Sequence, residues 1–287
     1  MNRRRLLSQA SIATWSFPFL RLSQSAPPPP ISFQGKIFKA VKTGKKLTSE
    51  DLEEIANLGF HGIEGSSPAI PQGEKDAFRA MIRHSGLPMH GVVNSVHWRQ
   101  RLSSPDPSIR LASRNALEEA ILDAHFFGGS SVLLVPGKVT GPEETHDHVW
   151  SRSRDEIQHL LPLASRLGIH ILIETVWNGF CYDPIQLRDY IDEINSPWVR
   201  VYFDIGNMQR FAPAESWIQT LGSRIVKLDV KDWGEKPGFC PLTQGDVNWA
   251  AVREALADIG FTGWATREGS DGGLSQTSAL MDEVLAL

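Results

Sequence analysis

The sequence predicts an α/β protein folded as a single (β/α)8 TIM barrel, and three observations favour this fold class. After residue 30 of the 287-residue chain, eight short apolar segments alternate with eight amphipathic ones. The apolar segments are nearly continuous runs of hydrophobic residues, which is typical of parallel strands buried on both faces. Glycine repeatedly follows the amphipathic segments, where it can end a helix. This many strand-helix pairs in a chain of this length indicate a closed barrel.

Residues 1–30 differ in kind from the rest of the chain. The basic run from Arg3 to Arg5 precedes a weakly apolar stretch, which ends in small residues and then in four prolines. This order is typical of an export signal, and the adjacent arginines resemble the twin-arginine type. We therefore predict an export signal with a proline-rich linker at 1–30, a catalytic barrel at 31–287, and a periplasmic or extracytoplasmic protein. If the segment is not a signal, the alternative is a cytoplasmic protein.

The first four strand-helix pairs follow this linker. Ser49 is a favourable N-cap for the first helix, because Glu50 and Asp51 would then lie in its first turn. Gly86 is placed to end the second helix, and Pro107 stands at a permitted first-turn position of the third. Strands are expected at 36–41, 62–65, 89–95 and 131–135, and helices at 49–59, 74–84, 106–127 and 146–167.

The last four pairs repeat the pattern. Pro162 should kink the helix that precedes them, and Asp183 with Pro184 forms a typical helix start. Strands are expected at 169–174, 198–204, 225–229 and 264–268, and helices at 183–194, 214–221, 248–259 and 274–287. The alternative fold is a doubly wound open sheet. It would need a phosphate-binding glycine loop after an early strand, and the sequence contains no GxGxxG or GxxxxGK motif.

Four of the predicted strands carry a carboxylate at or near the carboxyl end. In the segment IHILIETVWN the three isoleucines share one parity, so Glu174 points to the opposite face of the strand. Asp204, Asp229 and Glu268 hold similar places in the three later strands. Because catalytic residues of such barrels lie at the carboxyl ends of strands, we expect these side chains to converge. A divalent cation would relieve their repulsion, and oxygen ligands alone favour Mn²⁺ or Mg²⁺ over Zn²⁺.

Composition excludes several classes of partner. Lys and Arg number 29 against 33 Asp and Glu, a formal charge of −4, which gives no electrostatic reason to bind nucleic acid. Cys181 and Cys240 show no zinc-binding spacing. Beyond the N-terminus no stretch approaches the roughly 20 apolar residues of a membrane helix. We therefore expect a small-molecule substrate and, in the mature form, no membrane. Trp233 and Trp249, if exposed, would suit a homo-oligomer interface.

Several segments resemble one known family. FDIGN, KLDVKDW, PLTQGDVNWAAV and TREGS are similar to the xylose isomerase-like barrel family of sugar isomerases and epimerases, which includes ketose 3-epimerases. The resemblance implies a divalent metal, often Mn²⁺, with Glu174 and Glu268 as both ligands and proton-transfer groups and Asp204 as a ligand. Asp229 stands where the family commonly has histidine. Asn207 stands at a position that is often a substrate-binding histidine.

The chemistry of such a site can be stated physically. Removing a proton next to a ketone builds charge on the carbonyl oxygen, and a metal stabilises the resulting enediolate as a Lewis acid. One carboxylate can remove the proton, and a second can return it on the other face. We therefore predict a metal-dependent sugar isomerase or epimerase. The alternatives are a lyase or hydratase acting on a keto-sugar or an oxidised glycoside, and a sugar-binding barrel without turnover.

Further side chains near the strand ends are candidates for substrate binding. Trp177 and Asn178 follow Glu174 directly and could stack on a sugar ring and bond its hydroxyl groups. His90 lies near the same strand ends, although a lone histidine is more often structural. The candidate set is Glu64, His97, Trp177, Asn178, Asn207 and Lys227.

The segment IVKLDVKD leaves two interpretations open. Its alternation places Lys227 and Asp229 on one strand face and Val226 on the other. Lys227 could then offset the negative charge of the cluster or hold a substrate oxygen. The alternation of Lys227, Asp229 and Lys231 could instead be a ladder of ion pairs, in which case Asp229 would not be a metal ligand.

Overall fold

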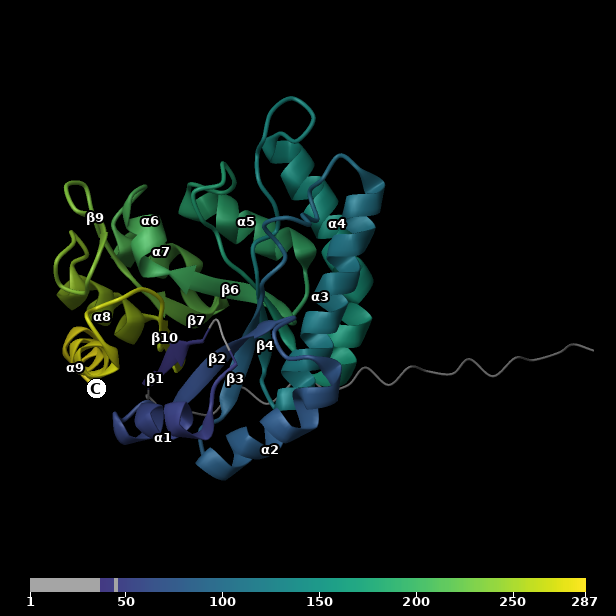
Figure 1. Ribbon diagram of the computed structural model, residues 1–287. Helices are drawn as coiled ribbons and strands as arrows, with labels where there is room; N and C mark the ends of the chain where they lie inside the picture. Colours follow the sequence, from purple (N-terminus) through teal and green to yellow (C-terminus); the bar gives the residue numbers. More distant parts are fainter. Residues whose placement is uncertain (1–36, 44–45) are drawn as a thin grey trace, which may run out of the picture.

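A computed structural model describes residues 37–43 and 46–287, and the predicted export signal and linker lie outside these ranges. Eight parallel strands close into a barrel in the order β1-β10-β7-β6-β5-β4-β3-β2 (Figure 1). The predicted single (β/α)8 barrel is therefore confirmed. The barrel strands are β1 (Ile37–Lys42), β2 (Gly62–Ser67), β3 (Met89–Asn94), β4 (Ser131–Leu134), β5 (His170–Ile173), β6 (Val199–Asp204), β7 (Ile225–Val230) and β10 (Gly263–Arg267).

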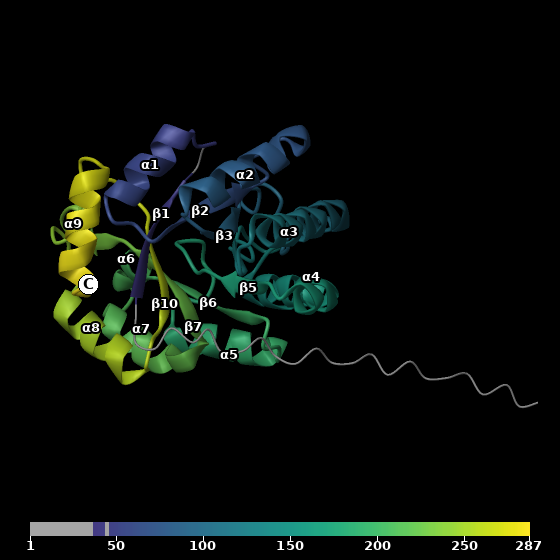
Figure 2. The same ribbon diagram turned by 90° about the horizontal axis from the view of Figure 1, so that it is seen from below.

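Helices surround this barrel on its outer side (Figure 2). The large ones are α1 (Ser49–Asn57), α2 (Lys75–Ser85), α3 (Pro107–Phe127), α4 (His146–Leu167), α5 (Pro184–Ile194), α7 (Ala214–Leu221), α8 (Trp249–Asp258) and α9 (Leu274–Leu285). The sequence did not lead us to expect α6 (Ile205–Gln209), a short helix directly after β6. α6 places Asn207 beside the mouth of the barrel.

Local signals explain most of the helix ends. Asp183 caps α5 as predicted, and Asp106 caps α3 in the same way, since each side chain accepts a backbone N–H from the first turn. The cap of α1 is Thr48 rather than Ser49. Thr48 exchanges two hydrogen bonds with Asp51, which satisfies two backbone N–H groups at once. Gly86 adopts a left-handed conformation with φ of 74° at the end of α2, as glycine does most easily.

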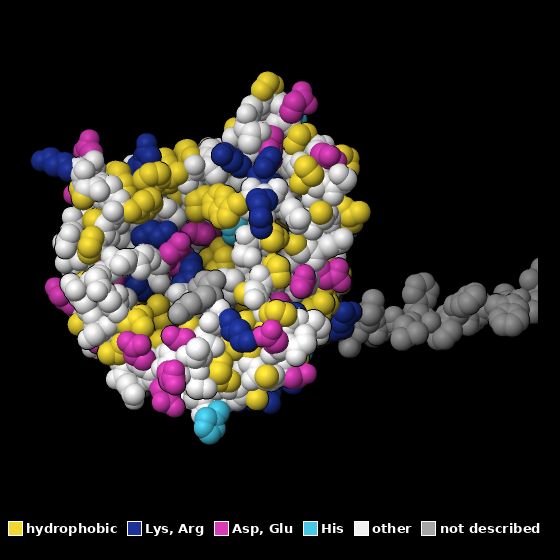
Figure 3. All heavy atoms as spheres, in the orientation of Figure 1, with side chains coloured by type: hydrophobic (Ala, Val, Ile, Leu, Met, Phe, Trp, Pro, Cys, Tyr) yellow, Lys and Arg dark blue, Asp and Glu magenta, His cyan; other side chains and the backbone are white. Residues whose placement is uncertain are grey.

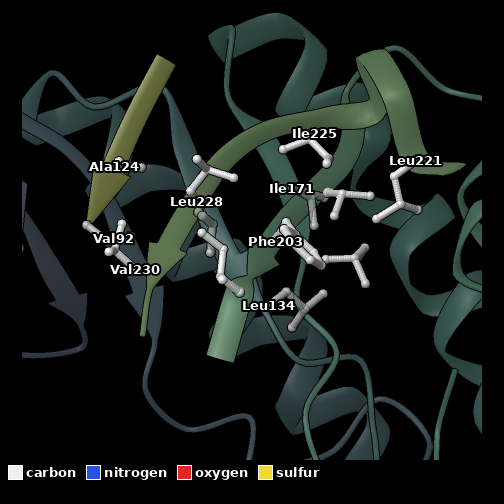
Figure 4. Packing of buried hydrophobic residues seen from close by; sticks show 14 of the residues in the cluster. Val92, Ala124, Leu134, Ile171, Phe203, Leu221, Ile225, Leu228 and Val230 are labelled. Carbon is white, nitrogen blue, oxygen red and sulfur yellow. The ribbon is translucent and has the colours of Figure 1, made fainter. Parts of the chain in front are cut away.

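The hydrophobic core lies mainly between the barrel and the helices. Strand residues such as Ile171, Phe203 and Leu228 pack in one cluster with Ala124 of α3 and Leu221 of α7 (Figure 4). This arrangement follows from the strand period of two, which sends alternate side chains outward to the helices.

Hydrophobic side chains that point into the barrel form a second, smaller cluster made of Leu133, Leu172 and Tyr202. Val226 packs against this inner cluster, so its predicted placement opposite Asp229 is wrong. The register between β6 and β7 shifts between Val201 and Tyr202, and Val226 has no partner on β6. A bulge of this kind adds a residue to one strand and changes which face its side chain meets.

A short hairpin, also unexpected, follows β7. β8 (Asp232–Gly234) and β9 (Gly238–Cys240) pair antiparallel and bring Trp233 opposite Phe239. Trp249 is buried and donates its indole N–H to Asp232, so its predicted place on an exposed partner surface is wrong. Within the described ranges, no helix has both the length and the apolar character needed to cross a membrane.

Candidate active site

The four predicted carboxylates meet at one end of the barrel. Glu174 follows β5, Asp204 ends β6, Asp229 lies in β7 and Glu268 follows β10. One oxygen atom of each lies within 4.8 Å of the corresponding atoms of the other three. Opposite ligands of an octahedral Mg²⁺ ion, with bonds of about 2.1 Å, would be about 4.2 Å apart. The set is therefore close to the dimensions of a single ion site.

Two lysines, Lys42 and Lys231, lie among these carboxylates. The sequence did not identify either of them as part of the site. Nζ of Lys42 lies 2.7 Å from Oδ2 of Asp229 and 2.8 Å from Oε2 of Glu268. Nζ of Lys231 lies 2.8 Å from Oδ2 of Asp204 and 3.4 Å from the same oxygen of Glu268. If all four carboxylates are ionised, two ammonium groups leave the cluster with a charge of −2. One divalent cation would balance it.

The donor set fits such an ion. Oδ1 of Asp229 is buried and has no hydrogen-bond partner among the described residues. An unpaired carboxylate oxygen in this position is costly unless something electrophilic binds it. Glu174, Asp204, Asp229 and Glu268 could therefore hold Mn²⁺ or Mg²⁺ through oxygen atoms alone.

Burial and the two lysines shift the pKa values of Glu174, Asp229 and Glu268 in different directions. Burial, with the charges of Asp204 and Glu268 added, raises the pKa of Glu174 to about 8. Burial also raises the pKa of Asp229 well above its usual range. Burial alone would raise the pKa of Glu268 too, but Lys42 and Lys231 outweigh it and hold that pKa at about 2. The negative charge is thus most firmly fixed on Glu268.

Asn207 connects the cluster to the wall of the pocket. Its backbone N–H donates to Asp204 at 2.8 Å, and its amide group donates to Asp204 at 2.5 Å and to Glu174 at 3.3 Å. Its backbone carbonyl accepts the indole N–H of Trp177 at 2.8 Å. Asn207 therefore orients two of the carboxylates and one aromatic side chain of the pocket.

A pocket of about 330 Å³ opens above the cluster. Figure 3 shows a hollow near the middle of this face, where acidic, basic and histidine side chains lie beside hydrophobic ones. The volume is enough for a small organic substrate. The polar lining residues are Lys42, His97, Glu174, Asn207, Lys231 and Glu268, and the aromatic ones are Trp98, Trp177 and Phe239.

His97 is held as a neutral side chain in this pocket. Its Nδ1 accepts the backbone N–H of Val135 at 3.3 Å. Burial, together with the nearby positive charge of Lys42, lowers the pKa of His97 to about 3. Because Nδ1 is an acceptor, the proton of the neutral ring is on Nε2, which is the remaining donor.

Three of the six predicted substrate-binding residues, His97, Trp177 and Asn207, line the pocket, and the other three do not. Asn178 stabilises a loop, since its amide donates to the carbonyl of Gly137 at 2.7 Å and accepts the N–H of Phe180 at 3.1 Å. Glu64 and Lys227 are fully buried below the carboxylates. A direct substrate contact does not follow from any of these three positions.

The deeper layer of the barrel is a chain of hydrogen bonds. Tyr202 lies 3.0 Å from Glu64 and 2.8 Å from Thr266, whose hydroxyl is 3.1 Å from Nε2 of His90. Lys227 bonds Nδ1 of His90 at 2.8 Å. Burial lowers the pKa of Lys227 to about 7, against the opposing charge of Glu64. His90 is thus part of the internal packing of the barrel.

Lys42 could have been found from the sequence by the rule that located the carboxylates. The residue comes directly after the predicted strand 36–41, at a carboxyl end that faces the mouth of the barrel. A single basic residue at a strand end is commonly exposed, so the position alone does not distinguish Lys42 from a surface lysine. For Lys231 the sequence indicates only a possible ladder of ion pairs with Lys227 and Asp229, whereas the structure pairs it with Asp204 and Glu268.

Comparison with known proteins agrees with this geometry. The family model described as xylose isomerase-like TIM barrel matches residues 52–285. The D-psicose 3-epimerase of Ruminiclostridium cellulolyticum is 25% identical over 230 residues, which are 76% of this chain and 76% of that protein. The L-ribulose-5-phosphate 3-epimerase UlaE of Salmonella typhimurium is 26% identical over 191 residues, covering 65% of this chain and 66% of that one.

Solved structures show the same fold. A protein described as D-tagatose 3-epimerase-like superposes with a TM-score of 0.76 at 17% identity, over 87% of this chain and 97% of that one. D-psicose 3-epimerase from Clostridium cellulolyticum H10, solved with D-tagatose, gives a TM-score of 0.71 at 18% identity, over 86% of this chain and 99% of that one. At these identities the likeness concerns the fold alone.

Proposed function

Because the chain belongs to the xylose isomerase-like TIM barrel family, we propose that it is a divalent-metal-dependent sugar isomerase or epimerase. The reaction is a proton transfer at the carbon next to the carbonyl of a keto-sugar. Relatives named as ketose 3-epimerases support this assignment. The observation that carries it is that Glu174 and Glu268 belong to one carboxylate cluster and line the same pocket.

Glu174, Asp204, Asp229 and Glu268 are the residues that would hold the metal. When bound there, Mn²⁺ or Mg²⁺ supplies a Lewis acid that stabilises negative charge on the carbonyl oxygen of the sugar. With all four carboxylates ionised, as metal ligands would be, Lys42 and Lys231 leave the cluster a charge of −2, which supports a divalent ion. The unpaired oxygen of Asp229 supports the same assignment.

Proton transfer falls to the two glutamates. Glu174 and Glu268 follow strands that β6 and β7 separate in the barrel, so the two carboxylates approach the pocket from different sides. One glutamate removes the proton from the carbon, and the other returns a proton to the opposite face, which inverts the configuration. Lys42 and Lys231 both contact Oε2 of Glu268 and thereby hold its carboxylate in one orientation.

The other pocket residues bind and orient the sugar. The Nε2–H of His97 is a donor for a sugar hydroxyl, because Nδ1 is already bonded to the backbone of Val135. Trp177 lines the pocket beside Glu174, and the exposed part of its ring suits the C–H groups of a sugar. Asn207 keeps this ring and the carboxylates in register through its hydrogen bonds to Trp177, Glu174 and Asp204.

Incubation with ketoses and Mn²⁺ in heavy water tests the proposal. We expect deuterium at the carbon next to the carbonyl together with formation of the epimer or isomer, and loss of both after treatment with a chelator. Formation of a dehydrated product would support a lyase or hydratase instead. Sugar binding without any exchange would support a binding protein without turnover.

We further propose that the protein is exported through the segment at 1–30. The basic run from Arg3 to Arg5 and the proline-rich linker support this location. Export would favour an unphosphorylated sugar, since sugar phosphates are expected to remain in the cytosol. Fractionation of cells that express the full chain, with an Arg4→Lys/Arg5→Lys variant beside it, tests the location. Equal export of the variant and of the unaltered chain would count against a twin-arginine signal.

A further inference from the structure

A second, outer cavity adjoins the catalytic pocket. It has a volume of about 750 Å³, against about 330 Å³ for the inner pocket. Trp177 and Phe239 line both cavities, so the two meet at this pair of rings.

The shared wall is a continuous aromatic surface. The rings of Trp177 and Phe239 stack with centroids 4.7 Å apart and an angle of 22° between their planes. Trp233 meets Trp177 edge to face at 6.1 Å. The guanidinium of Arg210 lies 4.4 Å from the centroid of Trp177. Nζ of Lys231 lies 5.3 Å from the centroid of Phe239. Trp177 is 36% exposed and Phe239 is 48% exposed, so part of each ring, beside these cationic groups, remains open to a ligand.

These side chains are held by their surroundings. Trp177 donates its indole N–H to the carbonyl of Asn207. Trp233 and Phe239 are paired across the β8–β9 hairpin. Asp246 fixes the hairpin by donating its N–H to Trp233 at 2.9 Å and accepting that of Glu235 at 2.7 Å. A preformed aromatic surface with polar groups at its edge is typical of a small-molecule site.

The charges of the outer cavity indicate a neutral ligand. Arg210 brings one positive charge, and Glu235 and Asp246 bring two negative ones. This balance disfavours a phosphate group, which would need an excess of positive charge. Guanidinium donors and carboxylate acceptors together do suit hydroxyl groups, which both donate and accept hydrogen bonds. The apolar ring faces suit the C–H surfaces of a sugar ring.

We propose that the outer cavity binds a second sugar ring, and that the substrate is therefore a neutral glycoside with a keto-sugar unit rather than a free monosaccharide or a sugar phosphate. This inference rests on the proposed function for the position of the keto-sugar unit. The keto-sugar lies in the inner pocket beside Glu174 and Glu268, and the attached sugar passes Trp177 and Phe239 and rests against Trp233 and the polar groups of the outer cavity.

Calorimetric titration of the Mn²⁺-loaded protein with four sugars tests the proposal. D-fructose, D-fructose 6-phosphate, isomaltulose and lactulose share the fructose unit, and the last two carry a second neutral ring at different positions. We expect at least one disaccharide to bind about 5- to 10-fold more tightly than fructose, a difference of about 1 kcal/mol or more. Fructose 6-phosphate should bind no more tightly than fructose.

Single substitutions separate the two cavities. Trp233→Ala and Glu235→Ala change residues that line only the outer cavity, so they should reduce disaccharide affinity to the level of fructose and leave fructose affinity unchanged. Trp98→Ala is the matched control. Trp98 lines the inner pocket and not the outer one. Its loss should therefore lower the affinity for fructose and the affinity for both disaccharides by the same factor.

Four outcomes would overturn the inference. They are equal affinity for fructose and both disaccharides, a disaccharide advantage that survives Trp233→Ala, tighter binding of fructose 6-phosphate than of the disaccharides, and no binding of any of the four sugars. A fifth contrary outcome would come from the molecular mass in solution. It is that the unaltered protein forms a dimer and that Trp233→Ala dissociates this dimer. Preferential disaccharide binding without deuterium exchange would contradict the proposed function and leave this inference standing.

Discussion

The ammonium group of Lys42 lies 2.7 Å from Oδ2 of Asp229, although β1 and β7 are not neighbours in the barrel. β10 stands between them, so Lys42 reaches Asp229 past the end of β10, where it also contacts Glu268. Burial alone would lower the pKa of Lys42, but Asp229, Glu64 and Glu268 outweigh it and hold that pKa well above its usual range. Lys42 is therefore a permanent internal counter-charge of the carboxylate cluster.

Replacing Lys42 by methionine should make the thermal stability of the protein depend more strongly on a divalent ion. Loss of one partner of a buried ion pair typically lowers the free energy of unfolding by about 3–5 kcal/mol, because the other charge stays buried. Bound Mn²⁺ would supply the missing positive charge. We expect Mn²⁺ to raise the melting temperature of Lys42→Met more than that of the unaltered protein, as measured by differential scanning calorimetry.

Lys46→Met is the control for this experiment. Lys46 is exposed and pairs with Glu74 outside the pocket, so its replacement should cost little stability and leave the response to Mn²⁺ unchanged. An equal thermal response to Mn²⁺ in Lys42→Met and in the unaltered protein would show that Lys42 is not a counter-charge of the ion site.

Glu268→Gln should abolish proton exchange without unfolding the protein. Glutamine keeps the size of the side chain but cannot accept a proton at neutral pH. Loss of a general acid-base group typically slows a reaction about 10²- to 10⁴-fold. Deuterium incorporation by mass spectrometry measures the rate, and circular dichroism checks the fold. Glu283→Gln, at an exposed position of α9, is the matched control, and exchange that persists in Glu268→Gln would remove this glutamate from the mechanism.

Asp229→His should change the metal preference of the site. Histidine is a softer ligand than carboxylate, and a site with one imidazole favours Zn²⁺ over Mn²⁺ more than a site made only of oxygen atoms. Competition between Zn²⁺ and Mn²⁺, followed by the electron paramagnetic resonance signal of free Mn²⁺, measures the ratio of affinities. We expect the ratio to shift toward Zn²⁺, and an unchanged ratio would mean that position 229 does not bind the ion.

Glu144 should contribute stability that disappears at acidic pH. Its carboxylate accepts hydrogen bonds from Arg101 at 3.0 and 2.7 Å, from Ser103 at 2.5 Å and from Thr140 at 2.9 Å. Burial alone would raise the pKa of Glu144, but these bonds together hold it below the ordinary value of 4.5. The contacts join the loop after β3, which carries His97 and Trp98, to the segment before α4.

The direction of the pH effect follows from that lowered pKa. The folded protein binds the proton less readily than the unfolded chain, so the contribution is complete above the unfolded pKa and is lost as the pH falls through the folded one. Melting temperatures of the unaltered protein and Glu144→Gln should therefore differ most near neutral pH and converge below about pH 4. A difference that stays constant down to pH 3 would contradict this account.

The sequence by itself determined the order of the elements and the principal acidic residues of the site. Both are local properties, because alternation within a strand decides which way a side chain points, and the last residue of a parallel strand always faces the same end of the barrel. Glu174, Asp204 and Glu268 could be identified in this way. Asp229 could be identified too, although its neighbours Lys227 and Lys231 allowed a different interpretation.

Only the tertiary structure decided which residues share the pocket. Lys42 reaches the cluster because barrel closure pairs β1 with β10 and brings Val41 opposite Arg267, one residue before Lys42 and Glu268. The register shift between β6 and β7 turns Val226 inward, and Lys227 is buried beside His90 rather than in the pocket. Register and closure depend on contacts between segments far apart in the chain, so no pattern within a single segment records them.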